Sequence, residues 1–214
     1  MRSSKLLKSL LLVFILIMFS HNVYSEFSFG FKLGMVISGH DCSFGADLKP
    51  RVGLCFSGFS SLKMSDYIFL DVELGFIRKG TIENIYFEYD DEAPFKTYNN
   101  RLDYISLPIH LNFKIPLDDF NFYFFLGPRI DFLIGYNAES LNYFYKEFKS
   151  SILGYNYGMG FEINVNQNWM FILETVVCLD ETSAYEDEAG NQIRNYCFQI
   201  LFGLEKNNKT KRKN

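Results

Sequence analysis

The sequence contains no apolar run long enough to cross a membrane as a helix. Its longest such run, residues 10–19, has ten residues, whereas a spanning helix needs about 20. Three basic residues precede the run, and the small or medium-sized residues 23–25 occupy the usual cleavage positions. We therefore expect a secretory signal peptide over residues 1–25 and a mature chain that starts near Glu26.

Positive charge is also scarce. The chain has 21 Lys and Arg against 25 Asp and Glu, a formal net charge of −4. Residues 1–25 carry three of the positive charges and no acid, so their removal changes −4 to −7. A nucleic-acid-binding protein would carry a basic patch or stripe, and we predict no nucleic-acid partner. The basic segment 206–214 has no apolar residue and predicts a disordered, solvated tail.

Histidine is rare, and no Cys-x-x-Cys spacing suggests a metal site. His21 falls in the expected signal peptide and His40 in a predicted loop, which leaves His110 in a predicted strand. Ser106 is four residues from His110, roughly 13 Å along a strand at about 3.3 Å per residue. A nucleophile and its base must approach to about 2.6–3.2 Å. We predict no catalytic residue, no cofactor and no metal.

Aromatic residues are abundant, and they recur with a period of two. Aromatics make up 18% of the chain. In residues 27–37 the odd positions are large and apolar, beginning with Phe27, whereas the even positions include Gly30 and Lys32. This alternation is typical of half-buried β-strands. It recurs in seven further segments, 51–57, 68–76, 105–114, 122–132, 153–162, 169–178 and 195–203.

The connections between these segments alternate in length. Residues 60–66, 116–119 and 164–168 are short connections. The other four are longer and polar, at 39–49, 80–100, 136–150 and 180–192. Short turns at one rim and long loops at the other indicate an all-β, eight-stranded antiparallel up-and-down barrel over residues 26–205, which leaves no open sheet edge.

The distribution of glycine indicates which face of the barrel points inward. A soluble lipocalin-like barrel would bury the apolar face, whereas an outer-membrane barrel would turn it to lipid. The polar face of the eight segments contains nine glycines and the apolar face none. Eight strands enclose an interior just wide enough for side chains, so we predict that the polar face lines the lumen of a transmembrane barrel.

In that orientation the charged residues plug the lumen instead of lining a pore. Four positive residues can pair with five negative ones, and His110 joins them as a hydrogen-bonded interior residue. The predicted interior network comprises Lys32, Arg51, Asp71, Glu73, His110, Lys114, Arg129, Asp131, Glu162 and Glu174. Pro108, which we place opposite Gly127 and beside Pro128, predicts a bulge because two N–H donors are missing there.

The four cysteines follow the inward parity near the long-loop rim. The exported chain would occupy a compartment where disulfides persist. Bridges between Cys42 and Cys55 and between Cys178 and Cys197 are one hypothesis, although four cysteines allow three pairings. The alternative, which the sequence favours equally, is that the cysteines are unbridged small side chains that fill interior space.

Six segments taken in order resemble a known family. They are FGFKLGMVIS (29–38), ELGFIRKG (73–80), LDYISLPIHLNF (102–113), FFLGPRIDFLIG (124–135), YGMGFEI (157–163) and FQILFGLE (198–205). The chain is similar to the PorT-like outer-membrane β-barrel proteins, whose members mostly lack an assigned activity. The resemblance implies a barrel in the outer membrane.

For function, we expect a non-catalytic outer-membrane protein with a structural, binding or assembly role. Outer-membrane lipid would surround it, and a protein partner would contact its long loops, of which 88–92 and 180–188 are acidic. Two alternatives are an outer-membrane lipid-modifying enzyme and, less strongly, a soluble secreted lipocalin-like barrel that binds an apolar ligand.

Overall fold

The computed structural model describes residues 27–41, 47–86, 95–118, 120–137, 145–187 and 192–207. These residues form ten β-strands, β1 (Phe27–Asp41), β2 (Asp47–Lys63), β3 (Ile68–Tyr86), β4 (Phe95–Pro116), β5 (Phe120–Asn137), β6 (Tyr145–Phe148), β7 (Ser151–Asn164), β8 (Trp169–Asp180), β9 (Tyr185–Asp187) and β10 (Gln192–Asn207). No helix among the described residues is long and apolar enough to cross a membrane.

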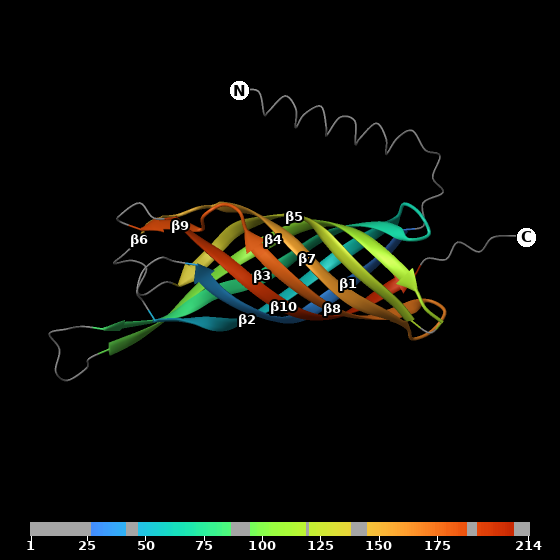
Figure 1. The fold of residues 1–214 in the computed structure, drawn as a ribbon, viewed down its shortest axis with the longest axis horizontal. Helices are drawn as coiled ribbons and strands as arrows, with labels where there is room; N and C mark the ends of the chain where they lie inside the picture. Colours follow the sequence, from blue (N-terminus) through green and yellow to red (C-terminus); the bar gives the residue numbers. More distant parts are fainter. Residues whose placement is uncertain are drawn as a thin grey trace, which may run out of the picture.

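Eight of the strands close into a ring (Figure 1). Their order is β1-β2-β3-β4-β5-β7-β8-β10, every neighbouring pair is antiparallel, and β10 pairs with β1 from Ser28↔Asn207 to Asp41↔Arg194. The predicted eight-stranded antiparallel barrel is confirmed. Closure satisfies the edge N–H and C=O groups of β1 and β10, which would otherwise be unpaired.

The two rims differ as the connection lengths predict. At one rim, short connections join β2 to β3, β4 to β5 and β7 to β8. At the other rim, the strands run further than expected. β3 and β4 continue through much of the predicted 80–100 loop and remain paired from Thr81↔Asn100 to Tyr86↔Phe95. That hairpin projects beyond the ring at the left of Figure 1.

Two short strands, β6 and β9, lie at the same long-loop rim. β6 pairs with β9, and β9 pairs with the start of β10 through Ile193↔Tyr185. Phe148 on β6 packs its ring 5.6 Å from that of Tyr185, and 4.5 Å from the ring of Tyr136 at the end of β5. The predicted loops 136–150 and 180–192 therefore contain ordered strand, joined to the barrel by aromatic contacts.

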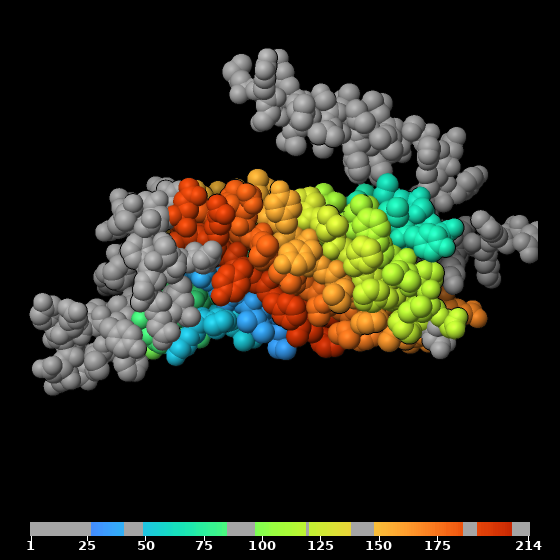
Figure 2. All heavy atoms as spheres, viewed as in Figure 1, coloured from blue at the N-terminus to red at the C-terminus, as the bar shows by residue number. Residues whose placement is uncertain are grey.

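The apolar residues face outward, as the glycine argument predicts. Val52, Leu54 and Phe56 on β2 are 61%, 61% and 59% exposed. Figure 2 shows one side of the barrel, where the side chains of β5, β7, β8 and β10 form a continuous outer surface. A water-soluble barrel could not leave this whole band in water, so the lipocalin-like alternative is wrong.

Aromatic residues mark both edges of the outer band. Tyr67 and Trp169 lie at the short-turn rim, whereas Tyr136, Tyr155 and Tyr196 face outward nearer the long-loop rim. Aromatic girdles of this kind sit at the two membrane interfaces of outer-membrane barrels. Since such barrels have short periplasmic turns and longer extracellular loops, the long-loop rim is the outer one.

Inward glycines make room for aromatic rings in the narrow lumen. A Cβ built on Gly160 would lie 2.5 Å from the hydroxyl oxygen of Tyr123, and one on Gly158 would lie 2.5 Å from Cζ of Phe125. Tyr123 and Phe125 are both buried. Glycine at these positions therefore leaves the space that the rings of Tyr123 and Phe125 occupy.

The bulge expected at the prolines does not form. Pro108 lies opposite Arg129, not Gly127. The ladder skips Ile109 and His110, and it resumes in the same register at Leu111↔Leu126. A proline removes one ladder hydrogen bond but inserts no residue, so the pairs on either side keep their register. The shift between β4 and β5 lies instead between Asp103 and Tyr104.

Some predictions fall outside the described residues. The signal peptide 1–25 and Cys42 are among them. β10 continues to Asn207, two residues into the segment expected to be the basic tail, and residues 208–214 are not described.

Candidate functional site

The lumen of the barrel contains two layers of ion pairs. The first, here called the upper cluster, lies toward the long-loop rim and comprises Lys79, Arg129, Asp131 and Asp180. Lys79 Nζ lies 2.8 Å from Asp131 Oδ2 and 3.1 Å from Asp180 Oδ1. Arg129 pairs with the same two carboxylates, through Nε at 3.0 Å from Asp131 Oδ2 and through Nη2 with Asp180. Two positive and two negative charges balance in this layer.

The second layer, here called the lower cluster, lies toward the short-turn rim. Lys32 Nζ lies 2.6 Å from Glu73 Oε1 and 2.8 Å from Glu174 Oε2. Lys114 Nζ pairs with Glu162 Oε1 at 2.5 Å. The layer comprises Lys32, Asp71, Glu73, Lys114, Glu162, Glu174 and Glu205, all of them buried.

The lower cluster has more acids than bases. Five carboxylates face two lysines, and His110 Nδ1 lies 3.4 Å from Glu73 Oε1 at its upper edge. Two carboxylate oxygens, Asp71 Oδ1 and Glu174 Oε1, have no hydrogen-bond partner among the described residues. An unpaired buried charge is costly, so this layer is the electrostatically less satisfied half of the lumen.

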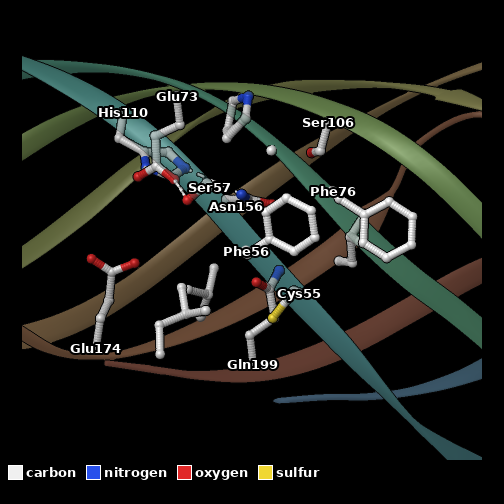
Figure 3. A pocket seen from close by; sticks show the side chains of 15 residues that line it. Cys55, Phe56, Ser57, Glu73, Phe76, Ser106, His110, Asn156, Glu174 and Gln199 are labelled. Carbon is white, nitrogen blue, oxygen red and sulfur yellow. Dashed lines mark hydrogen bonds and ion pairs between the residues drawn. The ribbon is translucent and has the colours of Figure 1, made fainter. Parts of the chain in front are cut away.

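Two cavities adjoin the lower cluster. The first, of about 30 Å³, is drawn in Figure 3 and is lined in part by Glu73, His110, Asn156 and Glu174. The second, of about 120 Å³, opens among residues near the short-turn rim, including Lys114. The first has room for about one or two water molecules and the second for several, so side chains fill most of the described lumen and leave the larger space near the short-turn rim.

Both ring nitrogens of His110 face polar side chains of the lumen. Its Nδ1 faces Glu73, and its Nε2 lies 3.2 Å from Nδ2 of Asn156. Ser57 Oγ donates to Glu73 Oε2 at 3.1 Å, not to the imidazole. Ser106 lies apart from His110 in Figure 3 and is opposite Asp131 in the β4–β5 register. In a nucleophilic site a hydroxyl or thiol would occupy the position that Asn156 holds.

Arg51 is the one predicted network residue that does not lie in the lumen. The β2–β3 register shifts by one residue where Arg51 lies, and a bulge changes the direction of a side chain. Its Nε donates to Asn99 Oδ1 at 2.7 Å. Its charged neighbours are Arg78, Arg101 and Asp103, which lie on the outward face of β3 and β4.

Sequence reasoning missed several members of the lumen network. Lys79 fell between the predicted strand 68–76 and the predicted loop 80–100, Asp180 was assigned to a loop, and Glu205 was not placed in the interior set. The signal was available, because continuing the inward alternation of each strand by a few residues reaches all three positions. The other nine predicted network residues are buried in the structure.

The described cysteines are free, buried thiols. Cys178 and Cys197 lie directly opposite each other on β8 and β10. Gln199 Nε2 lies 2.8 Å from Cys178 Sγ. In this structure the three described cysteines, Cys55 included, therefore fill interior space. Among the described residues, no group of three or more His, Cys, Asp or Glu side chains is arranged to hold a metal ion.

A family model described as outer membrane protein beta-barrel domain matches residues 19–179. No curated protein sequence matches the chain. The matched segment covers well over half of the sequence and includes the first seven strands.

Several solved outer-membrane proteins share the fold. OprG from Pseudomonas aeruginosa has a TM-score of 0.53 at 10% identity, over 85% of this chain and 96% of its own. Neisserial surface protein A has a TM-score of 0.50 at 11% identity, over 84% and 96%. AlkL, solved in lipid bilayers, has a TM-score of 0.53 at 13% identity, over 85% and 89%. At these identities the likeness concerns the fold alone.

Proposed function

The chain belongs to the outer membrane protein β-barrel domain family and resides in the outer membrane, and from this premise we propose that it is a non-catalytic binding or assembly component. Its contact surface is the long-loop rim. Its partners are the outer-membrane lipid around the barrel and a protein at that rim. Within the family we propose the PorT-like group, which the order of the six segments quoted above supports.

The observation that carries the proposal is the length of β3 and β4. A membrane-spanning strand needs about 9–11 residues, whereas β4 has 22 and β3 has 19. The outward apolar series on β3 ends at Phe76, and the paired residues 81–86 and 95–100, here called the blade, continue beyond it. Thr97 and Asn99 on the blade are polar and exposed. A paired extension outside the membrane offers a rigid surface for a partner.

The filled lumen supports the same proposal. Ion pairs join strands across the barrel at two levels, and the described cavities are small. A conduit for solutes would need a continuous polar channel. The enzyme alternative has less support, because the second ring nitrogen of His110 faces an amide.

Removing the blade tests the proposal. Since Thr81 and Asn100 lie opposite each other, residues 82–99 can be replaced by Asn-Gly, which favours a two-residue hairpin turn. We expect the shortened protein to reach the outer membrane and keep heat-modifiable gel migration, and to lose its protein partner.

The partner is sought with a photo-crosslinking residue at Thr97, and with the same residue at lipid-facing Leu74 as control. We expect a protein adduct from position 97 and none from position 74. Absence of an adduct at position 97 in intact cells would contradict a blade-mediated contact.

A separate measurement addresses catalysis. The lipids of cells producing the His110→Ala variant are compared by mass spectrometry with those of cells producing the parent. We expect identical lipid profiles. A lipid species that changes only with the variant would favour the enzyme alternative.

A further inference from the structure

Three arginines gather on the outer wall of the barrel, where the apolar band ends. Arg51, Arg78 and Arg101, here called the arginine cluster, come from the neighbouring strands β2, β3 and β4. Arg78 is the next outward residue after Phe76, and its guanidinium carbon lies 5.6 Å from the centroid of that ring. The cluster therefore lies where lipid tails give way to headgroups at the outer rim.

The cluster carries more positive charge than its neighbours compensate. Asp103 is the only acidic side chain that contacts it among the described residues. Arg78 Nε and Nη2 lie 2.8 Å and 3.3 Å from its two oxygens, and Arg101 Nε lies 3.4 Å from one of them. Three guanidinium groups against one carboxylate leave a local charge of about +2.

The donors of the cluster are also incompletely used. Arg51 Nε donates a hydrogen bond to the neutral amide oxygen of Asn99. Its Nη1 is buried without a hydrogen-bond partner among the described residues. Arg101 Nε likewise makes no hydrogen bond of good geometry. Unsatisfied buried donors are costly, and like charges at close range repel. An anion at this place would relieve both penalties.

The side chains remain accessible from the membrane. Those of Arg78 and Arg101 are 32% and 38% exposed. Below them, toward the middle of the membrane, Phe56 and Phe76 stack with 5.3 Å between ring centroids and an interplanar angle of 22°. A ligand with an anionic head and apolar chains could place its head on the arginines and its chains on the two phenylalanine rings below them.

We propose that the arginine cluster binds the phosphate-bearing headgroup of an anionic lipid in the outer leaflet, with its acyl chains along Phe56 and Phe76. The planar guanidinium group binds phosphate through paired hydrogen bonds, which suits Arg better than Lys at such a site. This inference does not depend on the proposed blade contact, since it concerns the lipid-facing wall.

The test is native mass spectrometry of the full barrel in a non-ionic detergent, titrated with diphosphoryl lipid A. We expect a retained lipid on the parent and at least tenfold weaker retention on the double variant Arg78→Gln/Arg101→Gln. Zwitterionic phosphatidylcholine at the same concentration should not be retained by either protein. Heat-modifiable migration verifies that each variant is folded.

Two further variants make the result decisive. Arg194→Gln alters an exposed arginine at the same rim on β10, away from the cluster, and should leave retention unchanged. Asp103→Asn removes the competing carboxylate and should strengthen retention several-fold, which remains measurable if the double variant fails to fold. Equal retention by the parent and the cluster variants, or an equal loss with Arg194→Gln, would overturn the proposal.

Discussion

Lys79 in β3 and Asp180 in β8 face each other across the full width of the barrel, with 3.1 Å between Nζ and Oδ1 and neither side chain exposed. In the ring of eight strands, β3 and β8 are four places apart, so this pair joins opposite walls. Desolvation offsets much of the attraction in a buried ion pair, but the loss of one partner leaves the other charge buried and uncompensated.

Replacing the lysine should therefore destabilise the barrel strongly. In Lys79→Met, Asp131 and Asp180 share only Arg129 as a cationic partner in the upper cluster. We expect a loss of about 3–5 kcal/mol in the free energy of unfolding, measured by urea unfolding in detergent micelles.

The matched control is an ion pair at the surface that also contains a lysine. Lys63 lies 3.0 Å from Asp66 at a short turn, where the side chains are 32% and 82% exposed. Lys63→Gln should change stability by less than about 1 kcal/mol. Equal effects of the two substitutions would mean that the upper cluster does not hold the walls together.

The acid excess of the lower cluster makes two carboxylates respond in opposite directions. Glu73 accepts from Lys32 and Ser57, so Glu73→Gln should destabilise by a few kcal/mol, on the order of the cost of breaking a buried pair. Asp71 Oδ1 has no hydrogen-bond partner among the described residues, so Asp71→Asn should be neutral or stabilising. Urea midpoints measured for both variants at one pH provide the comparison.

Destabilisation by Asp71→Asn that equals the effect of Glu73→Gln would contradict this asymmetry. It would mean that the Asp71 carboxylate has a stabilising role as strong as that of the paired glutamate.

The fold could be predicted because each strand carries one local pattern. Alternation depends only on neighbouring residues, and it gave eight strands and the inward face, which contains Lys32 and Glu174. The ends of the strands were harder to predict. Beyond the apolar band, residues 81–86 (TIENIY) and 95–100 (FKTYNN) mix polar and apolar residues without a period of two. The alternation that identifies a strand therefore disappears, and the blade was predicted as loop.

In the candidate site, too, local patterns place residues in the lumen but do not identify their partners. Parity places Arg129 in the lumen, but the choice of Asp180 as its partner depends on the order of the strands around the ring, in which β7 separates β5 from β8. Arg51 was misplaced because a bulge reverses the parity that the prediction relied on. The bulge itself depends on pairing with β3, which no local pattern in β2 reports.

Glycine on the inward face should be intolerant of even one methyl group. A Cβ at Gly160 would meet the Tyr123 hydroxyl and ring at 2.5–2.8 Å, and Tyr123 is held by its hydrogen bond to Glu174 Oε2 at 2.7 Å. We expect Gly160→Ala to cost about 1–3 kcal/mol, as overpacking typically does, measured by the temperature of the heat-modifiable gel shift and by urea unfolding.

Gly58 provides the control on the outward face. A Cβ there would meet only a backbone oxygen at 3.9 Å, so Gly58→Ala should leave stability unchanged or slightly raised. If the two substitutions had the same effect, lumen packing would not explain the inward glycines.

The cysteine pairing is open to a direct test, because strand register aligns only one pair among the three cysteines that the structure describes. Cys178 and Cys197 face each other across β8 and β10, and directly opposed antiparallel residues have Cα atoms about 4.5–5.5 Å apart, within the range of about 4.4–6.8 Å that a disulfide needs. Mild oxidation of the folded barrel should therefore join Cys178 to Cys197 and leave Cys55 as a thiol. The link would close a loop of about 20 residues and add about 3 kcal/mol of stability in the chain-entropy model. Peptide mapping without reduction identifies the bridge, and a link from Cys55 to either of the other two would show that the β8–β10 register does not decide the pairing.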